Sequence, residues 1–316
     1  MNKINVLDLF SGCGGLTCGM VDAGYNIVCS IDIWNPACAT LKANFEHTVL
    51  CKDLKTYEPK KFVEDTNIHD VAMIVGGFPC QSFSIAGKRD VNDPRGTLYM
   101  DYIKYIKYFH PKCFLMENVV GILSMKDKNG NKIVDNILNS LSDEYDCQYY
   151  KVNASDFEVP QNRKRIIFIG LRKDLHKKIF EPEKISKKHI PVKNILFKKE
   201  DIDKKCFLSE RAINGIKKKK ERMKKEGKGF GAQFLDLDKP SFTIPARYWK
   251  DGYDALVKYN ENEIRRLNIT EIKRIQTFKD DYKLCGTKKE QIMQLGNAVP
   301  VKLAYYLGLH IKKILS

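Results

Sequence analysis

The sequence contains no arrangement of cysteine or histidine that would indicate disulfide bonds or a structural metal. Its ten cysteines are scattered along 316 residues, and none belongs to a Cys-x-x-Cys pair. The six histidines show no zinc-type spacing, either with each other or with cysteine. These absences exclude a disulfide-rich secreted scaffold and a zinc-stabilised fold. We therefore expect a reducing compartment and no bound metal.

Long apolar runs are missing as well. No stretch approaches the length of a membrane span, and the sequence enters an expected strand almost at once, without the pattern of a signal peptide. We therefore expect a soluble, cytoplasmic protein with no membrane partner.

Acidic residues are fewer than basic residues in this sequence. There are 39 Asp and Glu against 55 Lys and Arg, which gives a formal charge of +16. Such an excess favours a polyanionic partner, nucleic acid first. A bias towards Lys, Asn and Ile, as in proteins from AT-rich genomes, would produce the same charge without that function. Charge alone therefore leaves both explanations open.

Residues 1–174 alternate between expected strands and helices. Residues 4–10 and 27–31 are typical strands, and the helix between them carries Leu16 and Met20 on one face, with Gly24 suited to its C-terminal cap. Asn35 and Pro36 predict an N-cap followed by a proline at the first helical position. Residues 149–152 and 166–171 are expected to close the sheet. This order predicts an α/β fold with a doubly wound, mostly parallel sheet.

The character of the chain changes after this region. Residues 175–240, continuing to about 260, are lysine-rich with weak strand signals, and the run from 217 to 225 is typical of a solvated helix. We expect a second, smaller domain here. In residues 261–316 we expect a helix near Thr270 and a last helix that carries Leu303 and Leu307. The last helix should pack back on the first domain.

A cysteine follows a buried strand at the position where α/β sheets bind ligands. The apolar run 71–75 is a typical strand, and Gly76-Gly77-Phe78-Pro79-Cys80 follows it. Cys80 should therefore stand at the carboxyl edge of the sheet, as a small and strong nucleophile. A cysteine that merely fills space is the alternative, since a catalytic thiol needs a partner.

Glu117 supplies such a partner. It follows the next apolar run, residues 113–116, and a helix with Leu98 and Tyr102 on one face separates the two strands. Strand, helix and strand form a right-handed unit with parallel, adjacent strands. Cys80 and Glu117 should then project from one edge of the sheet. The alternative for Glu117 is a capping or solvated carboxylate.

These residues resemble the two catalytic signatures of the C5-cytosine DNA methyltransferase family. Pro79-Cys80-Gln81 and Glu117-Asn118-Val119 match the signatures themselves. Three further elements match in the family's order: Asp8-Leu9-Phe10-Ser11-Gly12-Cys13-Gly14-Gly15, Gln161-Asn162-Arg163-Lys164-Arg165 and Gly296-Asn297-Ala298-Val299-Pro300. The resemblance implies a Rossmann-like methyltransferase fold, in which residues 175–240 form the target-recognition region that chooses the DNA sequence.

The resemblance also implies S-adenosylmethionine as the cofactor. Residues 10–15 form a glycine-rich turn after the first strand, called here the glycine turn. It lacks the Gly-Lys-Ser/Thr of a phosphate loop, and its glycine spacing differs from the dinucleotide fingerprint. Asp32 closes the second strand, where a carboxylate can bind both ribose hydroxyls. By resemblance, Ile33 packs on the adenine and Asp53 reads its amino group. The cofactor-binding residues are expected to be Phe10, Gly12, Gly14, Asp32, Ile33, Asp53, Leu98 and Asn297.

The expected reaction begins when the Cys80 thiolate adds to C6 of cytosine, which makes C5 nucleophilic. Glu117 would then work protonated, or share a proton with N3. By resemblance, Arg165 contacts the target base and steadies Glu117, while Arg163 faces the cysteine and nearby backbone. The target cytosine must leave the duplex, as it does for methyltransferases generally. The glycine-containing stretch after Cys80 is long enough to close over it.

Double-stranded DNA is the expected partner, bound by a monomer that associates with the nucleoid through DNA. A companion restriction endonuclease acting on the same site is possible in this family. A tRNA-modifying relative is an alternative, but its Cys-Phe-Thr element is matched only partly by Cys206-Phe207-Leu208. A catalytically dead homologue is another, against which the intact Cys80, Glu117, Arg163 and Arg165 argue.

Overall fold

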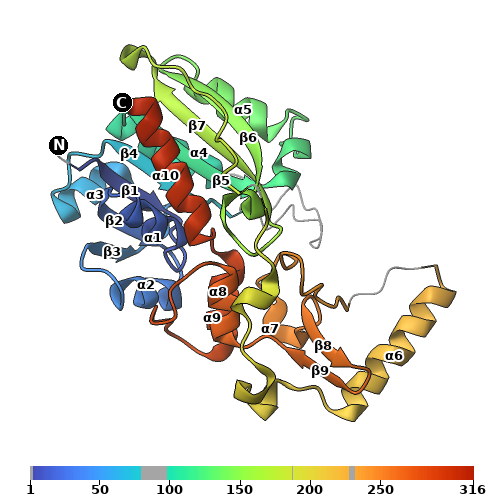
Figure 1. The fold of residues 1–316 in the computed structure, drawn as a ribbon. Coiled ribbons are helices and arrows are strands. Elements are labelled where there is room, and N and C mark those ends of the chain that lie inside the picture. The colour runs from blue at the N-terminus through green and yellow to red at the C-terminus, as the bar shows by residue number, and fades with distance from the viewer. Residues whose placement is uncertain (1–2, 80–97, 187, 228–231) are drawn as a thin grey trace.

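The computed structural model describes residues 3–79, 98–186, 188–227 and 232–316. Its centre is a seven-stranded sheet in the order β3-β2-β1-β4-β5-β7-β6 (Figure 1). The strands β1 to β5 run parallel, and β7 and β6 are antiparallel to their neighbours. The strands are β1 (Asn5–Leu9), β2 (Asn26–Asp32), β3 (Thr48–Cys51), β4 (Met73–Gly76), β5 (Cys113–Val119), β6 (Tyr145–Asn153) and β7 (Lys164–Arg172).

Helices cover both faces of this sheet because its buried strands are apolar on both sides. In β5, Cys113 and Leu115 face one core, whereas Phe114 and Met116 face the other. The helices of this part are α1 (Gly15–Asp22), α2 (Asn35–Lys42), α3 (Pro59–Thr66), α4 (Leu98–Phe109), α5 (Ile133–Leu141) and α10 (Val301–Leu315). The expected doubly wound, mostly parallel sheet is confirmed.

The chain winds outwards from β1 in both directions, through β2 to β3 and through β4 to β5. The switch point of such a sheet lies at the carboxyl ends of the two central strands, where ligands bind. Here these are β1, which leads into the glycine turn, and β4, which leads towards Cys80. Cys80 itself lies outside the described residues.

Several expected element ends shift in the structure. The first strand ends at Leu9 because Phe10 already has a left-handed φ of 54°. Asn35 is the first residue of α2 rather than its N-cap, which is Trp34. Helix α1 has Ala23 as its C-cap, and Gly24, with φ of 82°, follows it. The closing strands extend beyond the expected residues at both ends, since β6 and β7 pair with each other over their whole length.

The last helix, α10, packs along α1 as expected, which brings residues from the two ends of the described chain together (Figure 1). Helix α8 (Ile269–Ile275) confirms the helix expected near Thr270. It packs beside α9 (Lys288–Asn297), and their apolar residues share a core. None of the helices that the structure describes is long and apolar enough to span a membrane.

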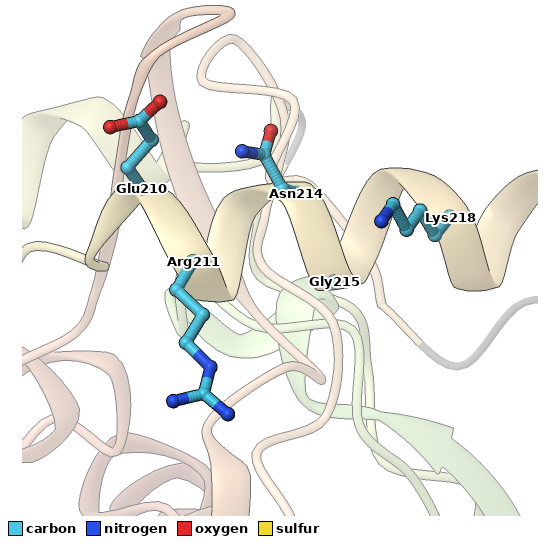
Figure 2. Close-up of a pocket in the computed structure, with 5 residues that line it drawn as sticks. All are labelled: Glu210, Arg211, Asn214, Gly215 and Lys218. Atoms are coloured by element: carbon cyan, nitrogen blue, oxygen red, sulfur yellow. The ribbon is translucent and has the colours of Figure 1, made fainter.

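A small two-stranded sheet, β8 (Leu256–Asn260) and β9 (Glu263–Arg266), lies away from the large one. It follows the short helix α7 (Tyr248–Asp251) and supports the long basic helix α6 (Glu210–Lys225). The expected lysine-rich helix over residues 217–225 is present as the second half of α6, where the described side chains are exposed or half-buried. Ile213 and Ile216, earlier in the same helix, are buried against the sheet. Figure 2 shows the outward side of α6, where Arg211 and Lys218 lie.

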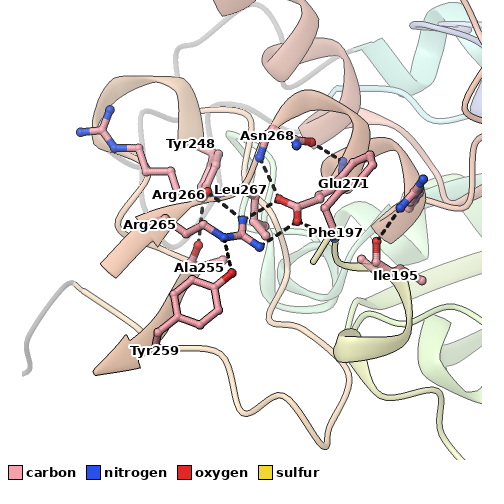
Figure 3. Close-up of polar contacts among 11 residues, drawn as sticks. Ile195, Phe197, Tyr248, Ala255, Tyr259, Arg265, Arg266, Leu267, Asn268 and Glu271 are labelled. Atoms are coloured by element: carbon pink, nitrogen blue, oxygen red, sulfur yellow. Dashed lines mark hydrogen bonds and ion pairs between the residues drawn. The ribbon is translucent and has the colours of Figure 1, made fainter. Parts of the chain in front are cut away.

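A buried ion pair connects this small sheet to α8 (Figure 3). The guanidinium of Arg265 donates to both carboxylate oxygens of Glu271, at 2.8 and 2.9 Å, and both side chains are fully buried. Glu271 also accepts from the backbone N–H groups of Asn268 and Phe197. Tyr259 accepts from Arg265 Nε at 3.0 Å. The pair thus joins β9, α8 and the segment around residue 197.

Candidate active site

Glu117 lies near the carboxyl end of β5, and β7 brings Arg165 beside it. Arg165 Nε is 2.7 Å from Glu117 Oε1, and both side chains are about nine-tenths buried. Antiparallel pairing of β5 with β7 sets this contact, because Val119 pairs with Arg165 two residues beyond Glu117. The structure therefore brings together Glu117 and Arg165, as the sequence predicted. A buried carboxylate paired with arginine can hold a polar substrate edge in a fixed orientation.

The Glu117 carboxylate faces the chain that leads to Cys80. A Cβ atom placed on Gly77 would lie 3.2 Å from Glu117 Oε2, so the glycine allows this close approach. Asn118 Nδ2 donates to the carbonyl of Phe78 at 3.1 Å. The end of β5 thus holds the backbone two residues before Cys80. The motif that contains Asn118 does not by itself indicate this contact, because the two residues are 40 positions apart.

Arg163 is 2% exposed and lies at the start of β7. It donates to the carbonyls of Gly296, at 3.1 Å, and Asn297, at 3.4 Å. Its Nε is buried without a hydrogen-bond partner among the described residues. Burial, together with the neighbouring charge of Arg165, lowers the pKa of Arg163 to about 9. Arg163 therefore ties the end of α9 to the sheet edge that carries Glu117.

The glycine turn after β1 has an unusual backbone. Phe10, Gly12 and Gly14 all have left-handed φ values, of 54°, 54° and 87°. Such a conformation is strained for phenylalanine and ordinary for glycine. The N–H groups of Ser11, Gly12 and Gly14 already donate to acceptors within the protein. What the turn offers at the switch point of the sheet is backbone without a side chain, with open space beside Gly12 that a ligand can approach closely.

Asp32, at the end of β2, is oriented by two backbone donors. Gly12 N–H donates to Oδ2 and Trp34 N–H to Oδ1, both at 2.8 Å. Burial raises the pKa of Asp32 above its ordinary value, which the backbone donors partly offset. Each oxygen retains a lone pair that can accept a hydroxyl group.

Four further predicted residues lie around this edge. Ile33, next to Asp32, has a side chain that is 64% exposed. Asp53 follows β3, the neighbour of β2, and one of its oxygens accepts from Lys55 N–H. Leu98 is buried at the start of α4, in the same apolar cluster that Phe10 contacts. Asn297 ends α9, with an exposed side chain, and reaches the site through its contact with Arg163.

Tyr282 supports the glycine turn and was missed by sequence reasoning. Its hydroxyl donates to the carbonyl of Cys13 at 2.6 Å and lies 2.9 Å from where a Cβ on Gly14 would stand. No local sequence signal identifies this contact, because the two residues are 269 positions apart. The described residues contain no group of three or more acidic, cysteine or histidine side chains that could hold a metal.

Comparison with known proteins agrees with this geometry. A sequence model of the family described as C-5 cytosine-specific DNA methylase matches residues 4–313. The Type II methyltransferase M.NgoPII of Neisseria gonorrhoeae is 32% identical over 100% of this chain and 97% of its own length. M.DdeI of Desulfomicrobium norvegicum is 42% identical over 57% of this chain and 44% of its own length.

A methyltransferase structure from Entamoeba histolytica superposes with a TM-score of 0.77 at 22% identity, covering 100% of both chains. At that identity the likeness bears on the fold alone. The chain belongs to the C-5 cytosine-specific DNA methylase family, and its class of enzyme is DNA (cytosine-5-)-methyltransferase.

Proposed function

We propose that this protein transfers a methyl group from S-adenosylmethionine to C5 of a cytosine flipped out of duplex DNA, through a covalent bond between Cys80 and C6. The observation that carries the proposal is the buried Glu117–Arg165 pair beside the strand that leads to Cys80. Residues 175–240 would form the target-recognition region, continuing to about 260.

The residues of the cofactor edge fit S-adenosylmethionine. Ile33 offers an open apolar surface for a purine, directly beside the oriented carboxylate of Asp32. Asp32 would bind the ribose hydroxyls, and Asp53 has an oxygen available for the adenine amino group. The turn from Phe10 to Gly14, with Leu98 and Asn297, would enclose the rest. When bound, the sulfonium supplies an electrophilic methyl group.

The protein's own residues would act in a fixed order. The Cys80 thiolate adds to C6, and the electron pair of the C5–C6 double bond moves towards N3, which takes a proton from Glu117. Arg165 holds the Glu117 carboxyl in place as its charge changes. C5 then carries the electron density for a bond to the methyl carbon that the bound sulfonium would supply, whose sulfur would leave as a neutral thioether. Transfer of the C5 proton to water, breakage of the C6–S bond and return of the N3 proton to Glu117 regenerate the thiolate and the acid and release the methylated base.

The experiment measures transfer of tritium from labelled cofactor to duplex DNA and to tRNA, followed by bisulfite sequencing of DNA from a host that expresses the protein. Labelled duplex DNA and one short methylated sequence are expected. Transfer to tRNA alone would support the RNA-modifying alternative, and no transfer would support a dead homologue. A companion restriction endonuclease, where one exists, would cleave the same sequence.

Two tests address covalent catalysis itself. Cys80→Ser should abolish methylation while the protein still binds cofactor and DNA, because the thiolate acts only in the bond-forming step. Duplex DNA with 5-fluorocytosine at the target should trap the wild-type protein, since fluorine cannot leave as a proton does. A normal methylation rate in the variant, or no denaturant-stable adduct, would rule out the covalent route.

A further inference from the structure

Helix α6 has one face that nothing in the described structure covers. Ile213 and Ile216 are buried against β8 and β9. On the opposite side a line of exposed residues follows spacings of four and three, which places them on one face of the helix. This line, called here the α6 stripe, consists of Arg211, Gly215, Lys218, Arg222 and Lys225.

Gly215 has no structural explanation within the molecule. It lies in the interior of the helix, where glycine is destabilising relative to alanine. A Cβ atom placed on it would meet nothing within 4 Å, and its φ is not left-handed. Neither packing nor a turn therefore requires glycine at this position. What glycine provides is close access to the helix backbone from outside the protein.

The stripe carries positive charge that the protein leaves largely uncompensated. Among the described residues, Arg211, Lys218 and Lys225 form no ion pair, and Arg222 has only a 3.9 Å contact with Glu226. The stripe spans 14 residue steps, or about 21 Å of helix. That length corresponds to about six base pairs of duplex DNA, whose rise is about 3.4 Å. A regular polyanion of this length complements the stripe.

The two ends of the stripe differ in chemistry. Figure 2 shows Glu210, Arg211 and Asn214 on the first turns of α6, with Gly215 and Lys218 further along the helix. Arginine can donate two hydrogen bonds to a guanine edge, and asparagine can donate to N7 of adenine while it accepts from N6, whereas a carboxylate repels phosphate and can accept from cytosine. The other end carries only cations on the stripe, which suit phosphate.

We propose that the α6 stripe binds duplex DNA with the helix in the major groove, Gly215 marking the closest approach. Arg211 and Asn214 read base edges, while Lys218, Arg222 and Lys225 hold phosphates. The major groove of B-form DNA admits an α-helix, but the deep, narrow groove of duplex RNA does not. This inference rests on the proposed function and assigns to one helix the contacts that select the target.

A matched pair of lysines tests the phosphate contacts. Lys218→Ala should weaken binding to a random-sequence duplex DNA several-fold, measured by fluorescence anisotropy, and should lower the salt slope by about 0.9. Lys217→Ala removes the same charge one residue earlier, off the stripe, and should change neither value. Equal effects of the two substitutions would overturn the assignment of the stripe. Binding needs no methyl transfer, so this test does not depend on catalysis.

Gly215 tests the close approach. Gly215→Ala should raise the melting temperature, because alanine favours the helix and meets no neighbour. Gly215→Leu should also fold, yet bind the methylated sequence at least tenfold more weakly, with binding to duplex RNA of the same sequence unaffected. Unchanged DNA affinity in Gly215→Leu, or an equal loss on duplex RNA, would contradict placement in the major groove.

Base reading is tested by bisulfite sequencing of hosts that express Asn214→Ala or Arg211→Ala. Each should still methylate cytosine but accept a second base at one position of the target. An unchanged target in both variants would overturn base reading by this helix. A wild-type protein that binds DNA through the stripe and transfers no methyl group would contradict the proposed function and leave the stripe as a DNA-binding surface.

Discussion

At the scale of single residues, the site depends on carboxylates whose surroundings are set by backbone contacts. Asp32 is the clearest case, since Gly12 and Trp34 donate to its two oxygens and so aim the carboxylate across the glycine turn. One side chain thus couples the end of β2 to the turn after β1. Its loss would leave two backbone donors without a partner.

We expect Asp32→Ala to weaken binding of S-adenosylmethionine by about 1–3 kcal/mol, measured by titration calorimetry. DNA affinity should change little. Asp22→Ala removes an exposed carboxylate at the end of α1 and serves as the charge-matched control, with no expected change in cofactor binding. Unchanged cofactor affinity in Asp32→Ala would remove this residue from the site.

The roles that the family resemblance implies for Glu117, Arg165 and Asp32 stay predictions. Local patterns were sufficient to place these three residues in or next to strands that the apolar runs indicate, where the structure has them. They could not reveal Tyr282, since its contact with Cys13 depends on how residues far apart in sequence meet. The expected roles of Asp53, Leu98 and Asn297 stay predictions, as does that of Cys80. The position of a side chain on a sheet edge does not by itself define what it binds.

Asp8 provides a prediction about pH. It is fully buried in β1, with Thr17 Oγ1 donating to Oδ2 at 2.5 Å. Burial raises its pKa from 3.8 to about 7. Between about pH 4 and pH 7 the folded state therefore keeps a proton that the unfolded state has lost, so this residue's contribution to stability falls as pH rises.

Asp8→Asn has no such proton to lose. The difference in unfolding free energy, variant minus wild type, should increase from pH 4 to pH 7 by an amount of the order of 4 kcal/mol and stay level above pH 7. Urea unfolding at several pH values measures it. His47, whose pKa burial lowers to about 4, acts in the opposite direction in both proteins and so cancels in the difference. A difference independent of pH would mean that Asp8 is ionised throughout.

At the scale of elements, two helical glycines illustrate opposite constraints. Gly19 lies where α1 crosses α10, and a Cβ atom there would stand 2.4 Å from the Cβ of Ala304 and 2.6 Å from the backbone N of Tyr305. The two helices therefore require glycine for their close approach. A Cβ atom placed on Gly215 in α6, by contrast, would meet no atom within 4 Å. The same substitution should thus have opposite effects in the two helices.

We expect Gly19→Ala to destabilise the protein by about 1–3 kcal/mol through overpacking. Gly215→Ala should stabilise α6 by up to about 1 kcal/mol. Thermal and chemical unfolding of the two variants beside the wild type would measure both effects. A neutral Gly19→Ala would show that α1 and α10 can move apart without loss.

Element types were easier to predict than element ends. Buried strands of the large sheet are apolar on both faces, so their runs stand out in the sequence. The short strands β8 and β9 escaped notice because each carries arginine or lysine within it, including the buried Arg265. A charged residue inside a strand is compatible with burial only when its partner, here Glu271, lies elsewhere in the chain. The sequence does not display that pairing.

At the scale of the whole molecule, the Arg265–Glu271 pair joins the small sheet to α8 and so to the helices beside the catalytic edge (Figure 3). Two fully buried charges stabilise each other only while both are present. Removing one leaves the other without water or a counter-charge. The connection between the two parts therefore responds sharply to single substitutions at this position.

Arg265→Met should destabilise the protein by about 3–5 kcal/mol, because Glu271 stays buried without its partner. The double variant Arg265→Met with Glu271→Gln should recover part of that loss, since a neutral amide needs no counter-charge and its oxygen can still accept from the backbone at Asn268 and Phe197. Urea unfolding followed by circular dichroism would compare the two. A double variant as unstable as the sum of its single changes would show that the pair itself contributes little.

The packing of α10 along α1 has a consequence for the time course of protein synthesis. Helix α1, which follows the glycine turn, leaves the ribosome well before residues 301–315 and lacks its packing partner until those residues have been translated. Contacts between such distant segments form late and slow folding. A nascent chain that stops before residue 301 therefore holds the glycine turn beside a helix whose apolar face is uncovered, and the proposed cofactor edge gains its support only after α10 has been made.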